Sequence, residues 1–383
     1  MYLGDWKSKL RVNASNIPGW HTKRHIVVIE SDDWGSIRMS SKEAFARLRD
    51  AGIPVDSDHY NINDALESND DLEMLFDCLL RFSDSTERHP VMTGVNVVAN
   101  PDFDAILANG FTKYVYEPYT RTCERYTRHD RVYELWKRGI ADRLFVPVLH
   151  GREHLNTQFW LRALTAKDPS TLVAFHERVT GIPRIGIGGA LVPNFQAAFE
   201  IDSMDDIPYQ KEVIRTGAQL FEELYGYRSK YFVPTNGPFN NSLERELLNA
   251  GIQYINTGKK QREPLGHGVY RVNTRFLGNK NHLGQFYLTR NCFFEPSAVG
   301  YELPTNFDCV KCCLKEIEIA FRWHKPATIS SHRVNYIGFL HPENREKGLK
   351  KLSQLLTEII KRWPDVEFMT SVELGDLIAS TEQ

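Results

Sequence analysis

The stretch His25-Ile26-Val27-Val28-Ile29-Glu30-Ser31-Asp32-Asp33-Trp34-Gly35 decides how the rest of this sequence is interpreted. An apolar, β-branched run that ends at two carboxylates and a glycine is typical of a buried strand. Ligands of α/β proteins bind at the carboxyl ends of strands, so this acidic pair is well placed for chemistry. A second interpretation stays open, in which Ser31 or Asp33 caps a helix that begins near Gly35.

Length and composition indicate a globular protein with a large core. The chain has 383 residues, 42% of them hydrophobic, which fits two average domains or one α/β barrel. A net charge of −2, a pI near 6.7 and the lack of long basic runs argue against nucleic acid as a partner. There is no leader-like N-terminus and no run of about 18 apolar residues. We therefore expect a cytoplasmic protein without a membrane partner, and no pattern predicts its oligomeric state.

Two motifs that look like ligand sites have simpler structural explanations. Cys309-Val-Lys-Cys312-Cys313 resembles half of a zinc site, but no second CxxC completes it. The three cysteines share one face of an expected helix, so we interpret them as small core residues. The glycine-rich piece 181–189 matches neither the dinucleotide-binding nor the P-loop spacing, and we expect a turn without a phosphate role.

After a polar surface arm over residues 1–24, strand-like and helix-like segments alternate. The pattern predicts an α/β protein: a single distorted (β/α)7–8 barrel over residues 1–383, with a cleft-shaping insertion at 53–140, between the first and third strands. Beyond the first strand, strands are expected at 91–99, 144–149, 230–233, 252–256, 268–273, 285–291, 327–331 and 366–370. Helices are expected at 41–51, 71–82, 129–139, 155–164, 170–179, 206–225, 242–250, 308–323, 343–363 and 371–379.

Four expected strands end on polar groups, and the strand ends of a barrel meet at one face. These groups are the Asp32–Asp33 pair, the histidines 150 and 154, the pair Asn236–Gly237, and His332. The two histidines, at i and i+4, would share one side of a helix and could bind one metal ion, although a cap or core role explains either one alone. One added carboxylate would give a His₂Asp set that leaves room for water and substrate.

Two adjacent aspartates can divide the work of a hydrolytic site. One can ligate the cation while the other takes a proton from water, whose pKa a bound cation lowers from 15.7 toward about 7. His332 can protonate a leaving amine or alkoxide, because the ordinary pKa of histidine lies near neutrality. The ligand set suits Zn²⁺ best, and Co²⁺, Ni²⁺, Mn²⁺ or Fe²⁺ are alternatives.

These motifs resemble those of the polysaccharide deacetylases, carbohydrate esterase family 4, also called the chitooligosaccharide deacetylase homology domain. The family's first motif is similar to Glu30-Ser31-Asp32-Asp33, its second to His150-Gly-Arg-Glu-His154 and its last to Ile329-Ser-Ser-His332. The resemblance implies a distorted (β/α) barrel, a zinc-type cation on Asp33, His150 and His154, Asp32 as base and His332 as acid. It also implies removal of acetyl groups, mostly from N-acetylated amino sugars.

The third motif departs from the family. There, an arginine that braces the base precedes Pro-Pro-aromatic-Gly, whereas Val233-Pro-Thr-Asn-Gly237 keeps the first proline and the glycine without an arginine. Arg290 or Arg333 would have to take that role. The backbone N–H of Asn236 matches the position that holds the oxyanion in the family. The expected substrate-binding set is Asn236, Gly237, Asn100, Trp34, Arg290 and Arg333.

The sequence therefore predicts a metal-dependent hydrolase that removes an acetyl group from an N-acetylated sugar or oligosaccharide. One alternative is a barrel that binds carbohydrate without turnover, which the missing arginine favours. Another is a glycoside hydrolase that uses two carboxylates without metal. Asp32 and Asp33 suit that chemistry poorly, because neighbours in an extended strand point to opposite sides.

Overall fold

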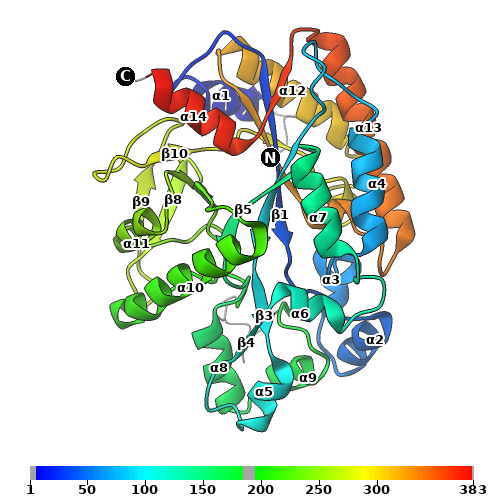
Figure 1. The fold of residues 1–383 in the computed structure, drawn as a ribbon, viewed down its shortest axis with the longest axis vertical. Helices are drawn as coiled ribbons and strands as arrows, with labels where there is room; N and C mark the ends of the chain where they lie inside the picture. The colour runs from blue at the N-terminus through cyan, green and yellow to red at the C-terminus, as the bar shows by residue number, and fades with distance from the viewer. Residues whose placement is uncertain (1–5, 184–194, 382–383) are drawn as a thin grey trace.

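The computed structural model describes residues 6–183 and 195–381, which form helices around a curved sheet (Figure 1). The strands are β1 Ile26–Trp34, β2 Met92–Val97, β3 Ala99–Pro101, β4 Tyr116–Pro118, β5 Phe145–Gly151, β6 Tyr231–Phe232, β7 Tyr254–Asn256, β8 Lys260–Pro264, β9 Tyr270–Thr274, β10 Phe286–Leu288, β11 Cys292–Phe293, β12 Ala327–His332 and β13 Glu367–Met369. The α-helices are α1 Trp6–Ser15, α2 Lys42–Asp50, α3 His59–Asn63, α4 Asn69–Leu79, α5 Phe103–Ala108, α6 Tyr119–Glu124, α7 Val132–Ala141, α8 Thr157–Thr165, α9 Pro169–His176, α10 Ile207–Tyr225, α11 Glu244–Asn249, α12 Cys309–Arg322, α13 Pro342–Arg362 and α14 Ser371–Thr381. Short 3₁₀ turns are η1 Val55–Ser57, η3 Met204–Asp206, η4 Asn241–Leu243, η5 Pro296–Ala298 and η6 Arg333–Tyr336.

The main sheet has nine strands in the order β10-β7-β6-β5-β2-β1-β12-β11, and β13 also pairs with β1. All of its strand pairs are parallel. Separate antiparallel hairpins join β3 to β4 and β8 to β9. The predicted (β/α) barrel-like class is confirmed, and the described sheet is an incompletely closed barrel.

The opening in the barrel lies where the sequence predicts one strand over 285–291. That stretch divides instead into β10 at one edge of the sheet and β11 at the other. Residues 289–291 alone join the two edges, and a fully extended chain from Leu288 to Cys292 spans at most about 14 Å. The edges therefore lie near each other without pairing. The strand expected at 268–273 is also outside the main sheet, because β9 pairs with β8.

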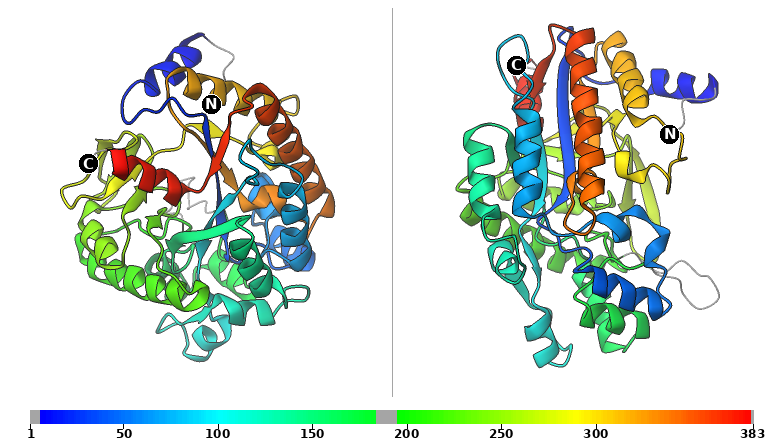
Figure 2. Two further views of the ribbon diagram at one scale, coloured as in Figure 1. Left: turned by 45° about the horizontal axis from the view of Figure 1, so that its top comes forward. Right: turned by 90° about the vertical axis from the view of Figure 1, so that its right-hand side faces the viewer.

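Strand β1 is buried along its whole length. Its side chains point alternately to the two faces of the sheet, and each face packs in a different apolar cluster. Val27 and Ile29 face outward into a large apolar cluster with side chains of α4, α12 and α13, helices that lie side by side in Figure 2. Ile26 and Val28 face the barrel interior. Side chains in a strand alternate, so the same inner face carries Glu30 and then Asp32 to the mouth of the barrel.

The N-terminal arm is partly helical, because α1 lies within it. The chain after α1 is fastened to the barrel: Lys325 Nζ donates to the carbonyl oxygens of Gly19 and Trp20 at 2.7 and 2.6 Å, and Trp20 Nε1 donates to Thr381 at 2.7 Å. The range 53–140 includes the central strand β2, and its role as an insertion within one domain stays a prediction. Among the described residues, no helix combines the length and apolar character needed to cross a bilayer.

Helix α13 approaches η6, which follows His332, at Gly348. A Cβ on this buried glycine would overlap the backbone oxygen of Asn335. In an ordinary helix, replacing glycine with alanine stabilises by about 1 kcal/mol. Here we expect Gly348→Ala to lower the free energy of unfolding by about 3 kcal/mol, because the packed η6 backbone must shift. Urea denaturation measures it. The control variant is Gly258→Ala, at an exposed glycine whose Cβ would meet only the backbone oxygen of Lys260, at an ordinary contact distance of 3.8 Å. A stabilised Gly348→Ala protein would contradict the packing described.

Candidate metal centre

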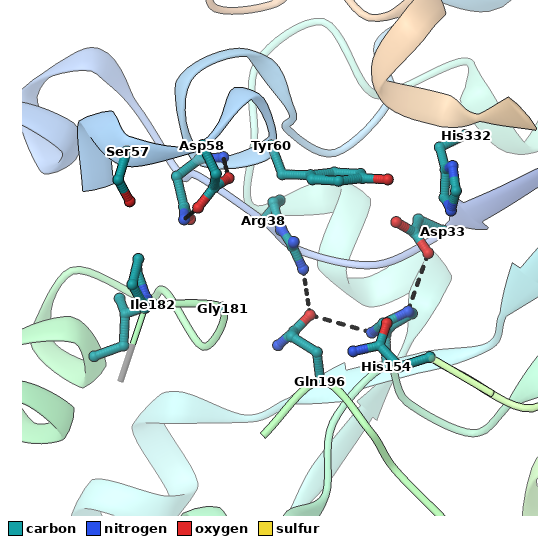
Figure 3. Close-up of a pocket in the computed structure, with 13 residues that line it drawn as sticks. Asp33, Arg38, Ser57, Asp58, Tyr60, His154, Gly181, Ile182, Gln196 and His332 are labelled. Carbon is teal, nitrogen blue, oxygen red and sulfur yellow. Dashed lines mark hydrogen bonds and ion pairs between the residues drawn. The ribbon is translucent and has the colours of Figure 1, made fainter. Parts of the chain in front are cut away.

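Asp32 and Asp33 both reach the mouth of the barrel, although neighbours in an extended strand face opposite ways. Asp32 on β1 is the register partner of His332 on β12, so the two residues lie side by side on neighbouring strands. Asp33 has a φ of +77°, which is uncommon outside glycine, and the register between β1 and β2 shifts between Ser31 and Trp34. This irregularity turns the Asp33 carboxylate toward His154 (Figure 3).

His150 and His154 meet at Asp33, but not from one helix as their spacing suggests. His150 belongs to β5, and His154 lies in the loop that leads to α8. Gly151 between them has a φ of +134°, a conformation that other residues avoid, and it bends the chain. The two Nε2 atoms lie 3.5 and 3.0 Å from Oδ1 of Asp33. The convergence predicted from the sequence is present, while the predicted helix is wrong.

Hydrogen bonds on the far side of each ring orient the two histidines. Nδ1 of His150 lies 2.7 Å from the carbonyl oxygen of Val233, and Nδ1 of His154 lies 3.1 Å from Oε1 of Gln196. A carbonyl oxygen only accepts, so each Nδ1 carries the hydrogen and each Nε2 presents a lone pair. Such lone pairs beside a carboxylate oxygen repel it unless a cation lies between them.

The three side chains suit a divalent cation. Their ligand atoms lie within 4.8 Å of one another, all three residues are buried, and Nε2 of His150 has no hydrogen-bond partner among the described residues. Burial lowers the pKa of His154 more than Asp33 raises it, so the ring is neutral, as metal binding requires. Two imidazoles and one carboxylate that leave open positions are typical of a catalytic zinc-type site.

Asp32 is held apart from this group by Arg290, which lies in the link between the sheet edges. The guanidinium donates to both carboxylate oxygens of Asp32, at 2.7 and 2.6 Å, and its Nε binds the fully buried Glu30. Burial alone would raise the pKa of Asp32, but Arg290 outweighs it and lowers that pKa. Of the two arginines proposed from the sequence, Arg290 is therefore the one that braces the expected base.

His332 faces the same space from β12. Its Nε2 lies 3.9 Å from Oδ2 of Asp32, and its Nδ1 lies 2.6 Å from Oε1 of Glu295. Asn335 Nδ2 donates to the other Glu295 oxygen at 2.7 Å. Burial would lower the pKa of His332, but the Glu295 carboxylate outweighs it and raises the pKa to about 10. The imidazole is therefore protonated at neutral pH and can serve as a proton donor.

A cavity of 420 Å³ opens beside these groups (Figure 3). Its lining joins the barrel mouth to α3, to the start of the glycine-rich piece and to the turn after β6. The lining residues are Asp33, Arg38, Ser57, Asp58, Tyr60, Asn61, His154, Gly181, Ile182, Pro183, Gln196, Asn236 and His332. Residues 184–189 of the glycine-rich piece lie outside the described residues.

Five of the six expected substrate-binding residues do not line this cavity, and one of them is Arg290, whose guanidinium is bound to Asp32 and Glu30. Trp34 is fully buried, with its Nε1 donating to Ser31 Oγ at 3.0 Å. Asn100 instead holds the turn after β1, through the carbonyl of Gly35 and the N–H of Ile37. Arg333 is fully buried between the carboxylates of Asp64 and Glu67 at 2.9 and 2.8 Å. Gly237 follows Asn236 in the turn without lining the cavity.

Sequence reasoning missed several polar residues of the site, and only one of them carried a usable signal. Glu30 is two residues before Asp32, so strand alternation places it on the same inner face. Glu295, Arg38 and Gln196 lie in loops or turns, and Tyr60 lies in the short helix α3. None belongs to a recognisable motif, and only the fold brings them to the barrel mouth.

No protein-family model matches the chain, and no curated protein matches it in sequence. Solved structures with a similar course of the chain include a putative polysaccharide deacetylase from Mycobacterium smegmatis (10% identity, 95% of this chain and 94% of that chain, TM-score 0.44). A probable polysaccharide deacetylase from Pseudomonas aeruginosa PAO1 is 10% identical; the match covers 92% of this chain and 91% of that chain, with a TM-score of 0.47. A 4-alpha-glucanotransferase from Thermococcus litoralis gives 11% identity and a TM-score of 0.45; 91% of this chain is covered, but only 40% of the glucanotransferase. Likenesses at these values carry no argument about activity.

We expect the tag-free protein to bind about one Zn²⁺ or Co²⁺ per chain, and His154→Ala to weaken binding by more than about 100-fold, since loss of an outer-sphere partner alone costs 10–100-fold. Titration calorimetry on chelator-treated protein measures both. His282→Ala, at a histidine whose side chain is 77% exposed, is the control and should bind like the wild type. Equal metal affinity of the His154 variant and the wild type would place the ion elsewhere.

Arg290→Met should lower the free energy of unfolding of metal-free protein by about 3–5 kcal/mol near pH 7, because it leaves two buried carboxylates without a cation. The lowered pKa of Asp32 contributes stability that is present above its unfolded pKa near 4 and lost as the pH falls. In the variant the buried Asp32 has lost its cation, so its pKa rises above its unfolded value and the stability of the variant falls as the pH rises. The deficit should therefore shrink from pH 8 to pH 5.

Urea denaturation in EDTA at several pH values tests this, with Arg49→Met at an exposed position as the control. If the difference in free energy of unfolding between the variant and the wild type does not change with pH, the guanidinium does not set the charge state of the buried carboxylates.

Proposed function

We propose that this protein is a metal-dependent hydrolase that removes an acetyl group from an N-acetylated sugar or oligosaccharide. The observation that carries the proposal is the division of two adjacent carboxylates. Asp33 lies with two metal-competent imidazoles, while Asp32 is bound to Arg290 and lies beside a protonated His332 on the neighbouring strand. A binding protein has no need of a braced base opposite a charged acid. The sugar class comes from the resemblance of the motifs to polysaccharide deacetylases.

Asp33, His150 and His154 would hold the cation. When bound, such an ion supplies Lewis-acid polarisation of a carbonyl and lowers the pKa of water. Asp32, kept ionised by Arg290, accepts the proton of the attacking water. The backbone N–H of Asn236, at the edge of the cavity, is the proposed donor to the carbonyl oxygen on which charge develops.

Protonated His332 completes the reaction by donating its Nε2 proton to the leaving nitrogen, while Glu295 on Nδ1 holds the ring in place. The water oxygen bonds to the acetyl carbon, the carbon–nitrogen bond breaks, and acetate and a free amine leave. The proton accepted by Asp32 and the proton lost by His332 balance the hydrolysis.

Arg290 weakens the alternative of a barrel that only binds carbohydrate, because that alternative rested on a missing bracing arginine. A metal-independent glycoside hydrolase needs one protonated carboxylic acid, and it is opposed because, against the effect of burial, Arg290 lowers the pKa of Asp32 and the two imidazoles lower that of Asp33. Each alternative has its own outcome in the test of activity.

In that test, zinc- or cobalt-loaded protein is incubated with N-acetylated amino-sugar oligomers, and acetate, free amine and shortened oligomers are measured. We expect acetate without chain cleavage, and a fall in kcat of about 10²–10⁴-fold in Asp32→Asn and in His332→Ala. Asp365→Asn, at an exposed carboxylate, is the control. Full activity of Asp32→Asn would contradict the mechanism, and cleaved oligomers without acetate would favour a glycoside hydrolase.

A further inference from the structure

Arg38 lies in the cavity, held on three sides. Its Nη1 donates to Oε1 of Gln196, the oxygen that also accepts from His154. Its guanidinium carbon lies 5.1 Å from the centre of the Tyr60 ring, and the backbone of Gly181 packs against its outer edge. In Figure 3 the side chain stands between Tyr60 and Gln196, with Asp33 and His154 on one side and Ser57 and Asp58 on the other. The guanidinium is therefore positioned before any ligand arrives.

Arg38 forms no direct ion pair with a carboxylate among the described residues, and its buried Nε has no hydrogen-bond partner there. The buried Asp64 is near enough for the Arg38 charge to act on its pKa, but Asp64 is already bound by Arg333. The undescribed segment 184–194 contains no Asp or Glu in its sequence. Asp58, which also lines the cavity, is engaged by the backbone and side-chain N–H groups of Asn61 at 2.8 and 2.6 Å. Partly buried charges of this kind are normally paired.

We propose that Arg38 binds a carboxylate of the substrate, so that the preferred substrate is an acidic N-acetylated amino sugar, such as a uronic acid. This inference rests on the proposed deacetylase function and adds its substrate class. A planar guanidinium with free N–H groups binds a carboxylate through two parallel hydrogen bonds. On the side of the cavity away from His332, Arg38 faces Asp58, and this arrangement suits one negative charge better than the two of a phosphate. Because Arg38 shares Gln196 with His154, the carboxylate belongs to the same sugar ring as the reacting acetamido group.

Binding is tested apart from turnover, in zinc-loaded protein carrying Asp32→Asn. Calorimetry compares the methyl glycosides of N-acetylglucosaminuronic acid and N-acetylglucosamine, which differ only in a carboxylate against a hydroxymethyl group. We expect the acid to bind about 30-fold more tightly, and Arg38→Met to remove that preference, given the usual strength of charge-assisted hydrogen bonds. Arg49→Met, at an exposed arginine, is the matched control. Zinc content of each variant, measured by elemental mass spectrometry, shows that the metal site is intact.

Equal binding of the two sugars, no binding of either at millimolar concentration, or a preference that survives in Arg38→Met would overturn the proposal. Sodium acetate is a further probe. If acetate alone binds as tightly as the acidic sugar and with the same dependence on Arg38, the site accepts small anions in general. The proposal that it recognises a sugar carboxylate would then be wrong. Acetate release by the wild type is assayed separately. A wild type that binds the acid through Arg38 but releases no acetate would refute the deacetylase function and leave the anion site standing.

Discussion

One guanidinium bound to two buried carboxylates underlies both the barrel and its site. Glu30 and Asp32 face inward from β1 because strand side chains alternate, and neither could stay charged there without a cation. Arg290 supplies it from residues 289–291, the short link between the unpaired edges of the sheet. Tyr231 and Ser371 donate to Glu30 at 2.8 and 2.6 Å, so the same cluster connects four separate parts of the chain. The same arginine thus connects the link between the two sheet edges to β1 and braces the proposed base.

The geometry of Asp33 depends on that arrangement. With Asp32 fixed on Arg290, a left-handed φ at the next residue redirects Asp33 to the histidines instead of to the opposite face of the sheet. Such strained backbone, which costs of order 1–3 kcal/mol, persists only where surrounding contacts determine it. Here the turn after β1 is held from several directions, by Asn100 on Gly35 and Ile37 and by Glu67 on the Gly35 N–H. Arg333, which directly follows β12, is buried and binds Glu67, so it connects the turn after β1 to the end of β12.

Strand ends were the predictable part of the site, and loops were not. Alternation along β1, and the positions of His150 and His332 at the ends of apolar runs, predict that these residues meet at one face of a barrel. The sequence does not show that Gly151 bends the chain to return His154, nor that 285–291 divides so that Arg290 reaches Asp32. Trp34, Asn100 and Arg333 look like ligand contacts because they are polar or aromatic near strand ends. Asn100 and Arg333 are buried instead, because the polar backbone of the turn after β1 needs internal partners, and Trp34 packs in the apolar core.

Anomalous diffraction from crystals of the zinc-loaded protein, recorded above and below the zinc absorption edge, tests the central claim most directly. The account predicts one strong peak about 2.0–2.2 Å from a carboxylate oxygen of Asp33 and from Nε2 of both His150 and His154, with Asp32 still bound to Arg290. A peak that includes Asp32 among the ligands, or no peak at the barrel mouth, would contradict the division of the two aspartates into a metal ligand and a base.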